Sequence, residues 1–335
     1  MSEIRYDLLH NEYVLIAPER LHRPMPQHSL SMHSTQKCPF CPGNEELTPQ
    51  EIFSVKENGT WQTRVIANLY KAVQIETPFL SKRDGLNEMW GGYGAHEIVI
   101  DTPNHYANLH TMSKEEIFWW LFTLQERFID LRKDQKMIAL QIFKNHGISA
   151  GATQSHPHTQ IIALPIMTKT QLALFEHCQR YYHHHGRALH EDIISFEIEK
   201  KERNLYESDN FFSYIPYASS FAFETVILSK DLKFDECSQN ELKELSTHIL
   251  LLFHALSKEL GDFPFNLVFY LPPLNENFEN SSFFHETENI FRFFIRITPR
   301  IYTLGGFEIS TGSMINPVLP ETVAKLLRRW YETGS

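Results

Sequence analysis

Two segments of the chain carry apolar residues at the three- and four-residue spacing of an amphipathic helix. The first begins after Ser113 and the second after Ser238. Each serine is followed three residues later by a glutamate, Glu116 or Glu241, which is the capping-box pattern of a helix N-terminus. The apolar stripes consist of Ile117, Trp120, Leu121, Leu124, Phe128 and Leu131 in the first helix and of Leu242, Leu245, Ile249, Leu252, Leu256 and Leu260 in the second.

The segments around the two helices are strand-like and follow the same order. Glu97–Ile100 and Glu224–Leu228 precede the helices, and Met137–Ile142 and Phe265–Tyr270 follow them. This order, repeated about 125 residues later, predicts two related α+β units that form either one continuous sheet or two halves around a cleft. The competing interpretation is a coincidence between two common α+β patterns.

A segment of mixed charge separates the two units. The predicted organisation is therefore an N-terminal unit over residues 1–167, a connector over residues 168–203 and a C-terminal unit over residues 204–335. Within the connector we expect a helix near Lys169–Tyr182 and a turn at Gly186. The run His183–His185 looks like a metal-binding tract, but such runs are more often a solvated helix end, which is the interpretation we favour.

Composition and charge narrow the class of protein. Hydrophobic residues make up 42% and charged residues 21% of 335 residues, which is typical of a globular protein with one large or two smaller domains. The net charge is −10 and no stripe of Lys and Arg is present, which argues against nucleic acid as a partner. Without a long apolar run or a signal-peptide pattern, we expect a cytoplasmic protein that does not bind membranes.

The stretch Ser155–Gln160 carries the densest candidate chemistry. It follows a run of small residues and precedes the apolar residues Ile161–Leu164, so a loop leading into a strand is expected. Side chains two positions apart share one face of a strand, which brings His156, His158 and Gln160 to one patch. Such a patch can bind a metal, attack a phosphorus atom or hold a phosphate oxygen; the alternative is a polar strand edge with incidental histidines.

Cys38–Pro39–Phe40–Cys41–Pro42–Gly43 has the pattern of a zinc knuckle. Two thiolates at this spacing reach one tetrahedral ion when the turn between them is tight. Two further ligands are then required, and His105 and His156 are candidates. A redox pair or two buried thiols are the alternatives, although a redox pair usually begins a helix, which Pro42–Gly43–Asn44 disfavours.

Several short motifs also occur in a fixed order along the chain. They are Pro18–Pro24, Cys38–Cys41, Asn68–Tyr70, Thr102–His105, Phe143–Gly147, His156–Gln160, Pro216–Ala218, Phe223–Thr225 and Gly305–Glu308. Over nearly the whole chain, their order and spacing resemble those of the galactose-1-phosphate uridylyltransferase family of the histidine-triad superfamily. The resemblance implies an α+β fold of two tandem histidine-triad-like units, with a mainly antiparallel sheet and helices packed on it.

The resemblance assigns roles to individual residues. It implies that Cys38, Cys41, His105 and His156 bind one structural zinc ion, a position at which iron can replace zinc. It implies that His158 is the nucleophile and that Gln160 binds the α-phosphate. The implied substrate-binding residues are Arg20, Arg23, Asn68, Asn145, Thr153, Ser155, Phe307 and Glu308, with Arg20 and Arg23 reaching across the interface of a homodimer.

The implied activity is transfer of UMP from UDP-glucose to a hexose 1-phosphate through a uridylyl-His158 intermediate, as in galactose metabolism. Small-molecule nucleotide sugars and hexose 1-phosphates are the expected partners. Leu69 stands where some members carry an acidic residue beside the uracil, and the stretch from Gly305 to Pro317 is closer to the ADP-glucose phosphorylase branch. An ADP-sugar or dinucleotide phosphorylase is therefore the near alternative, followed by a nucleotidyl hydrolase and a nucleotide-binding module without turnover.

Overall fold

The computed structural model describes residues 2–22, 37–275, 284 and 286–333. Its centre is a ten-stranded sheet in which every neighbouring pair of strands is antiparallel. The strands in spatial order are β10 (Asn204–Glu207), β11 (Phe211–Tyr214), β12 (Thr225–Ser229), β14 (Phe294–Pro299), β13 (Phe265–Tyr270), β8 (Ala139–His146), β9 (His158–Leu164), β7 (Ala95–Ile100), β4 (Thr60–Ala67) and β3 (Glu51–Glu57). This arrangement confirms the predicted antiparallel α+β fold.

The sheet is symmetric about its central pair, β8 and β13. The spatial order outward from β8 is β8, β9, β7, β4 and β3. Outward from β13 it is β13, β14, β12, β11 and β10, so strands at the same distance from the centre take the same place in the sequence of their half. The two halves draw on residues 51–164 and 204–299 and join in one continuous sheet. The division at residues 167 and 204 stays a prediction, since the central pair binds both halves into a single body of structure.

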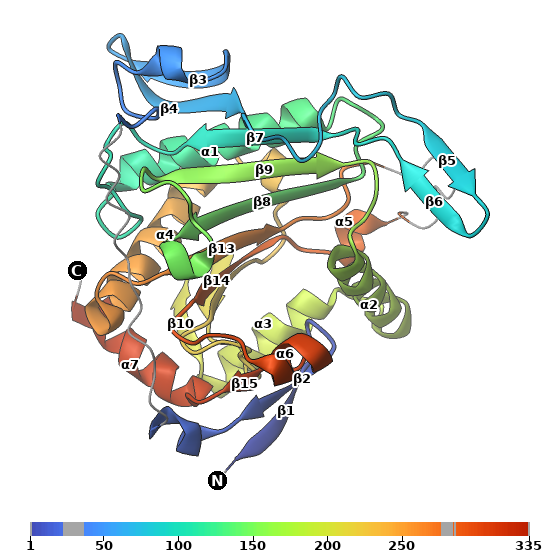
Figure 1. The fold of residues 1–335 in the computed structure, drawn as a ribbon. Coiled ribbons are helices and arrows are strands. Elements are labelled where there is room, and N and C mark those ends of the chain that lie inside the picture. Colours follow the sequence, from blue (N-terminus) through green and yellow to red (C-terminus); the bar gives the residue numbers. More distant parts are fainter. Residues whose placement is uncertain (1, 23–36, 276–283, 285, 334–335) are drawn as a thin grey trace.

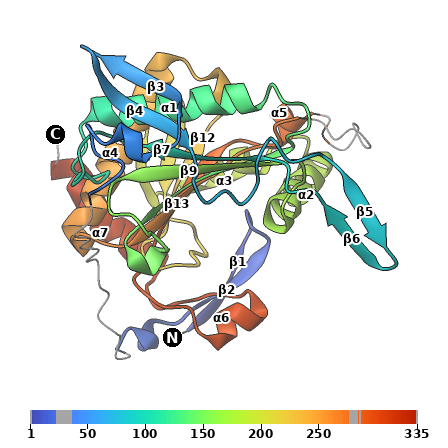
Figure 2. The same ribbon diagram turned by 45° about the horizontal axis from the view of Figure 1, so that its top comes forward.

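One face of the sheet is covered by three helices, α1 (Lys114–Leu131), α4 (Gln239–Leu260) and α7 (Pro320–Thr333), as Figures 1 and 2 show. The apolar stripes predicted for α1 and α4 are buried against alternate residues of the strands, except for Leu260 at the end of α4, which is half-buried. Both helices begin with the predicted capping boxes, since Ser113 and Ser238 each accept a hydrogen bond from the backbone N–H of the glutamate three residues on.

The opposite face is divided between the two halves. Over the C-terminal half it is covered by α2 (Lys169–His185) and α3 (Leu189–Lys200), which both lie within residues 168–203. His183–His185 are exposed in the last turn of α2, which ends at Gly186 in the left-handed conformation, as expected for a solvated helix end. Over the N-terminal half this face is covered only partly, and we call it the open face.

A small second sheet joins the two ends of the chain. It contains β1 (Glu3–Asp7), β2 (Glu12–Ile16) and β15 (Ile315–Asn316), with η1 (Pro18–His22) and α6 (Gly306–Thr311) beside it. β15 pairs in parallel with β2, a contact between residues about 300 positions apart that local patterns do not predict. A hairpin of exposed strands, β5 (Ser81–Asp84) and β6 (Asn87–Trp90), projects from the molecule on the side away from the small sheet (Figure 2).

The remaining elements are short. They are η2 (Glu45–Leu47), η3 (Ile148–Ala150), η4 (Phe234–Glu236) and α5 (Thr287–Ile290). Among the helices described, none combines the length and apolar character needed to cross a membrane.

Candidate functional site

The site is built around the first residues of β9. Side chains alternate along this strand, so Thr159, Ile161 and Ala163 are buried toward the helices while His158 and Gln160 lie on the open face. On the inner face, Trp120 Nε1 of α1 donates a hydrogen bond of 2.9 Å to Thr159 Oγ1. This bond and the apolar contacts fix which face each residue takes, because a shift by one residue would turn every side chain over.

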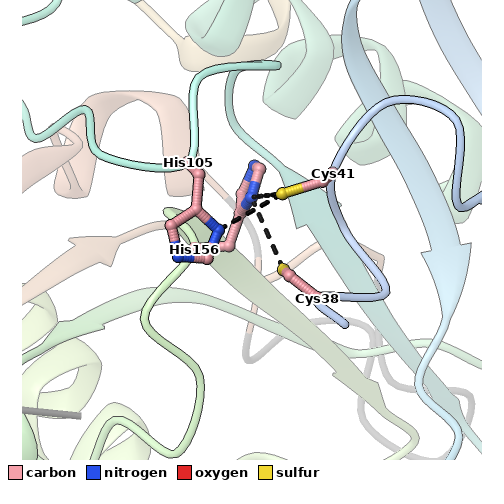
Figure 3. A group of neighbouring side chains, drawn as sticks. All are labelled: Cys38, Cys41, His105 and His156. Atoms are coloured by element: carbon pink, nitrogen blue, oxygen red, sulfur yellow. Dashed lines mark hydrogen bonds between the residues drawn. The ribbon is translucent and has the colours of Figure 1, made fainter. Parts of the chain in front are cut away.

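Four side chains from separate parts of the chain meet beside the start of β9, as Figure 3 shows. The ligand atoms of Cys38, Cys41, His105 and His156 all lie within 4.8 Å of one another. Cys41 Sγ lies 3.3 Å from His105 Nδ1 and 3.6 Å from His156 Nδ1, and Cys38 Sγ lies 3.8 Å from His156 Nδ1. Zn–S and Zn–N bonds at a tetrahedral angle place sulfur and nitrogen about 3.6 Å apart, so the four residues fit a closed Cys2His2 metal site.

The surroundings of this cluster suit a bound cation. His156 Nε2 donates to the Thr102 carbonyl at 2.9 Å, which directs Nδ1 toward the cysteines. Burial lowers the pKa of His156 to about 4, so the ring is neutral and keeps its lone pair near pH 7. Burial and the neighbouring Cys38 raise the pKa of Cys41 to about 11, a cost that a cation between the sulfurs removes.

His158 is oriented by the backbone of its own strand. Its Nδ1 lies 2.9 Å from the His156 carbonyl oxygen, which can only accept, so Nδ1 carries the proton and Nε2 keeps its lone pair. Burial is the main cause that lowers the pKa of His158. Phe40, inside the cysteine knuckle, packs edge-on against this ring at 5.6 Å between centroids. The knuckle therefore holds His156 and covers His158 at the same time.

A buried ion pair that the sequence analysis did not assign lies behind His158. Lys144 Nζ of β8 donates to Asp101 Oδ2 at 2.6 Å and to the His158 carbonyl at 3.4 Å. Both side chains are almost fully buried, and the Asp101 backbone N–H also donates to the Pro157 carbonyl at 3.1 Å. This pair connects β8, the end of β7 and the start of β9. Lys144 stood in one of the family motifs, but only its position between these strands shows what it does.

His96 of β7 is a second residue that the sequence analysis did not assign. Its Nδ1 accepts a hydrogen bond of 3.1 Å from the backbone N–H of Ala72, so the ring proton lies on Nε2. That Nε2–H donates to Gln160 Oε1 at 3.1 Å, and the same nitrogen lies 2.9 Å from Asn68 Nδ2, which is itself a donor and so is not its hydrogen-bond partner in this tautomer. The ring thus holds the oxygen of Gln160 and leaves its NH2 group free to donate into the site. The indication that the sequence offered was the occurrence of this histidine, Ile98 and Ile100 at alternate positions along an apolar strand.

Most of the other predicted residues of the N-terminal half lie around this patch. Asn145 lies near the end of β8, where its Oδ1 accepts a hydrogen bond of 2.8 Å from Asn266 Nδ2. Thr153 and Ser155 are exposed in the loop before β9, and Ser155 Oγ is 3.2 Å from His105 Nε2. A pocket of about 510 Å3 is lined by Asn68, its neighbours from Ala67 to Lys71, Pro49 and Gln74.

Three predicted residues do not join the patch within one chain. Arg20 lies in η1, and Phe307 and Glu308 lie in α6, next to the small sheet and apart from β9 in both views (Figures 1 and 2). Glu308 accepts a hydrogen bond of 2.9 Å from the Gly305 N–H at the start of α6. Arg23 lies outside the described residues. The site that one chain forms therefore consists of the residues of the N-terminal half around the buried ring of His158.

The sequence and the fold of this chain are similar to those of known proteins. Residues 1–168 match the family described as "Galactose-1-phosphate uridyl transferase, N-terminal domain". The chain is 31% identical to ADP-glucose phosphorylase of Arabidopsis thaliana, over 97% of this chain and 92% of that protein. It is 28% identical to galactose-1-phosphate uridylyltransferase of Thermotoga maritima, over 98% of each. The solved structure of the Arabidopsis thaliana ADP-glucose phosphorylase with bound ADP-glucose superposes with a TM-score of 0.82 at 29% identity, over 98% of each chain.

The Cys2His2 geometry predicts how the metal content responds to substitution. We expect Cys41→Ser to lower the bound zinc or iron and the midpoint of thermal unfolding, because it removes one of the ligands that join the knuckle to His156. Elemental analysis and thermal unfolding measure the two effects. Cys178→Ala, which removes a buried thiol outside the cluster, is the control and should leave the metal content unchanged. Equal metal content in all three proteins would contradict the prediction.

Proposed function

The chain belongs to the galactose-1-phosphate uridylyltransferase family and is a nucleotidyltransferase, and we propose that it transfers UMP from UDP-glucose to a hexose 1-phosphate through a covalent intermediate on His158. The observation that carries this proposal is the tautomer of His158, whose Nδ1–H is held by a backbone carbonyl while Nε2 retains a lone pair on the open face. A neutral imidazole in this state is a competent nucleophile near neutral pH.

The proposed reaction consists of two displacements. His158 Nε2 attacks the α-phosphorus, a P–N bond forms, and the bond from phosphorus to the oxygen of hexose 1-phosphate breaks. A second hexose 1-phosphate then attacks the same phosphorus through a phosphate oxygen, and the P–N bond breaks with return of the lone pair to Nε2. The NH2 group of Gln160 donates to an α-phosphate oxygen in both steps, where negative charge is spread over the phosphoryl group.

The Cys2His2 cluster would hold a structural metal in this scheme. Cys38, Cys41, His105 and His156 would hold the zinc ion, which would join the knuckle rigidly to the residue two positions before His158. Iron suits the same mixed thiolate and imidazole donors. Because in-line attack tolerates little displacement of the nucleophile, the position of His158 depends on this joint.

A second candidate is phosphorolysis of an ADP-sugar through an adenylyl-His158 intermediate. We propose that the pocket around Asn68 binds the nucleobase and call it the base pocket. Two observations favour the second candidate: the 31% identity with ADP-glucose phosphorylase of Arabidopsis thaliana, and Leu69, an apolar residue that lines this pocket. The two candidates share His158, Gln160 and Asn145 and differ in the nucleobase and in the acceptor. The similarity to several uridylyltransferases favours the first candidate, transfer of UMP.

Completion of the site by a partner subunit is part of the proposal. Arg20, Phe307 and Glu308 cluster around the small sheet, away from their own β9. A homodimer in which this sheet faces the open face of the other chain would bring Arg20 and Arg23 to the phosphates and Phe307 and Glu308 to the hexose. In that arrangement Glu308 still has one carboxylate oxygen for a sugar hydroxyl, because its cap uses only Oε2.

Intact-protein mass spectrometry tests the covalent intermediate. After brief incubation with UDP-glucose and no acceptor, we expect a mass gain equal to one UMP, absent in His158→Asn because the amide has no nucleophilic nitrogen. His184→Asn, at the exposed end of α2, is the matched control and should gain the same mass as the wild type. A gain of AMP from ADP-glucose instead would select the second candidate. No gain with either donor in folded protein would contradict the covalent mechanism.

His96 is expected to act through Gln160. His96→Phe keeps a ring in place but removes the Nε2–H that holds Gln160 Oε1, and we expect kcat to fall by about 100-fold. Gln160→Leu should cause a similar loss. In the double variant the loss should stay close to that of either single variant, because both remove the same contact to the phosphate. Losses that multiply in the double variant would show that His96 acts independently.

Complementation tests the shared site. Arg20→Ala and His158→Asn should each be nearly inactive, and their mixture, after dissociation and reassociation, should recover part of the activity. A heterodimer then contains one site with both residues intact. A mixture that stays inactive although heterodimers form, or a protein that sediments as a monomer while active, would contradict the cross-subunit arrangement.

A further inference from the structure

A cavity of about 340 Å3 lies in the C-terminal half, far along the sheet from His158. Three segments line it: Tyr6–Leu9 at the end of β1, one side of α3, and Tyr214 with Pro216–Ala218 at the end of β11. None of these residues belongs to the proposed transfer site. Because the two halves of the sheet are related by symmetry, the residues that correspond to this cavity in the N-terminal half can be identified from the strand register.

When the equivalent strands β9 and β14 are aligned from their first residues, His158 and Phe294, the register relates the two halves residue by residue. Gln160 pairs with Ile98, and Arg296 pairs with Val226, in corresponding strand pairs. In the next pairs outward, Ile66 faces Ile98 and Tyr214 faces Val226. Counting onward from Ile66 and Tyr214, Asn68–Tyr70 corresponds to Pro216–Ala218. Both triplets line a pocket at the end of the corresponding strand. The cavity is thus the counterpart of the proposed base pocket.

The chemistry beside the pocket differs between the halves. By the same register Phe294 takes the place of His158, and Arg296 takes that of Gln160. Arg296 Nε donates at 2.7 Å to Glu224, the counterpart of His96. The ring of His10 packs edge-on against Tyr270 and Phe294, with centroids 5.7 and 6.1 Å apart. The region that corresponds to the phosphate site is therefore filled, and only the part that corresponds to the base remains hollow.

The lining determines which ligand fits. Aromatic rings of Tyr6, Phe196, Tyr214 and Tyr217 form much of the wall. Its charged residues are Asp7, Asp192 and Glu197, and among the described lining residues none is Lys or Arg, so the cavity disfavours a phosphate. Arg5 and Arg203 stack on Tyr217 without lining the cavity and are paired with Glu321 and Glu197.

Glu197 adds a hydrogen-bond acceptor to the cavity wall. Its residue is 4% exposed, Oε1 accepts from Arg203, and Oε2 has no hydrogen-bond partner. Such a buried acceptor is unfavourable until a donor reaches it. Because Oε2 is itself enclosed, an amino group or a ring N–H of a ligand would reach it only if the Glu197 side chain turns toward the cavity.

We propose that this cavity is a second, non-catalytic site that binds a nucleoside without its phosphates, with the base between the aromatic rings and a base N–H directed toward Glu197. The choice of a nucleoside as the ligand rests on the proposed base pocket around Asn68. The presence and the lining of the cavity do not depend on that proposal. The site would add sensitivity to free nucleosides to an enzyme whose substrates are nucleotide sugars.

Calorimetric titration of the full-length protein with adenosine and with uridine tests the proposal. Ile193→Trp fills the cavity from α3, and we expect it to weaken binding by at least about tenfold. Phe196→Ser removes a half-exposed ring from the wall and should weaken binding as well, without a change in the core. Ser195→Trp, on the same helix but outside the lining, is the matched control and should bind as the wild type does. Asn68→Ala alters the catalytic pocket and should leave this binding in place.

Three results would overturn the proposal: no binding of either nucleoside, equal binding in Ile193→Trp, Phe196→Ser and the wild type, or binding that is lost only in Asn68→Ala. The covalent transfer step is measured separately through the mass gain on His158, which Ile193→Trp should retain. Loss of that mass gain with nucleoside binding intact would refute the transfer proposal alone, and the reverse would refute the second site alone.

Discussion

The alternation of side chains along β9 is the constraint on which the rest of the site depends. Thr159 is held inward by Trp120 and Ile161 is packed in the core, so His158 and Gln160 have to face outward. Every other contact of the site acts on a strand whose face is already determined. The core beneath β9 therefore has a direct chemical consequence: it decides that the imidazole and the amide stand side by side on the open face.

Two buried polar groups then act on the beginning of the strand from opposite sides. The Lys144–Asp101 pair lies behind it, and the Cys2His2 cluster lies in front of it. A buried ion pair gains little stability over apolar residues of the same volume, because both charges lose their hydration. Its contribution here is positional, since Lys144 also binds the His158 carbonyl. The strand end that carries His158 is thus held by interactions that cost more to form than apolar packing would.

The sequence predicted those features that depend on local patterns. Capping boxes and apolar stripes identified α1 and α4, and the alternation after His156 identified the outward pair on β9. The role of His96 was not predictable in this way, because it requires that β7 pair with β9 in one particular register. The Lys144–Asp101 pair was not predictable for the same reason, because Lys144 lies in β8 and Asp101 directly follows β7. The pairing of β15 with β2 and the position of Arg20 depend on contacts between chain ends, which no local pattern encodes.

The symmetry of the sheet explains why the two halves serve different purposes. In the N-terminal half the open face is left to His158, whereas in the C-terminal half α2, α3 and the turn after β1 cover the same face. The N-terminal hairpin is consequently anchored on the C-terminal half. The segment that follows it, η1 with Arg20, is thereby directed away from its own β9. If Arg20 binds phosphate as proposed, it needs a second chain to reach the site, so the covered C-terminal face and the proposed shared site would be two consequences of one arrangement.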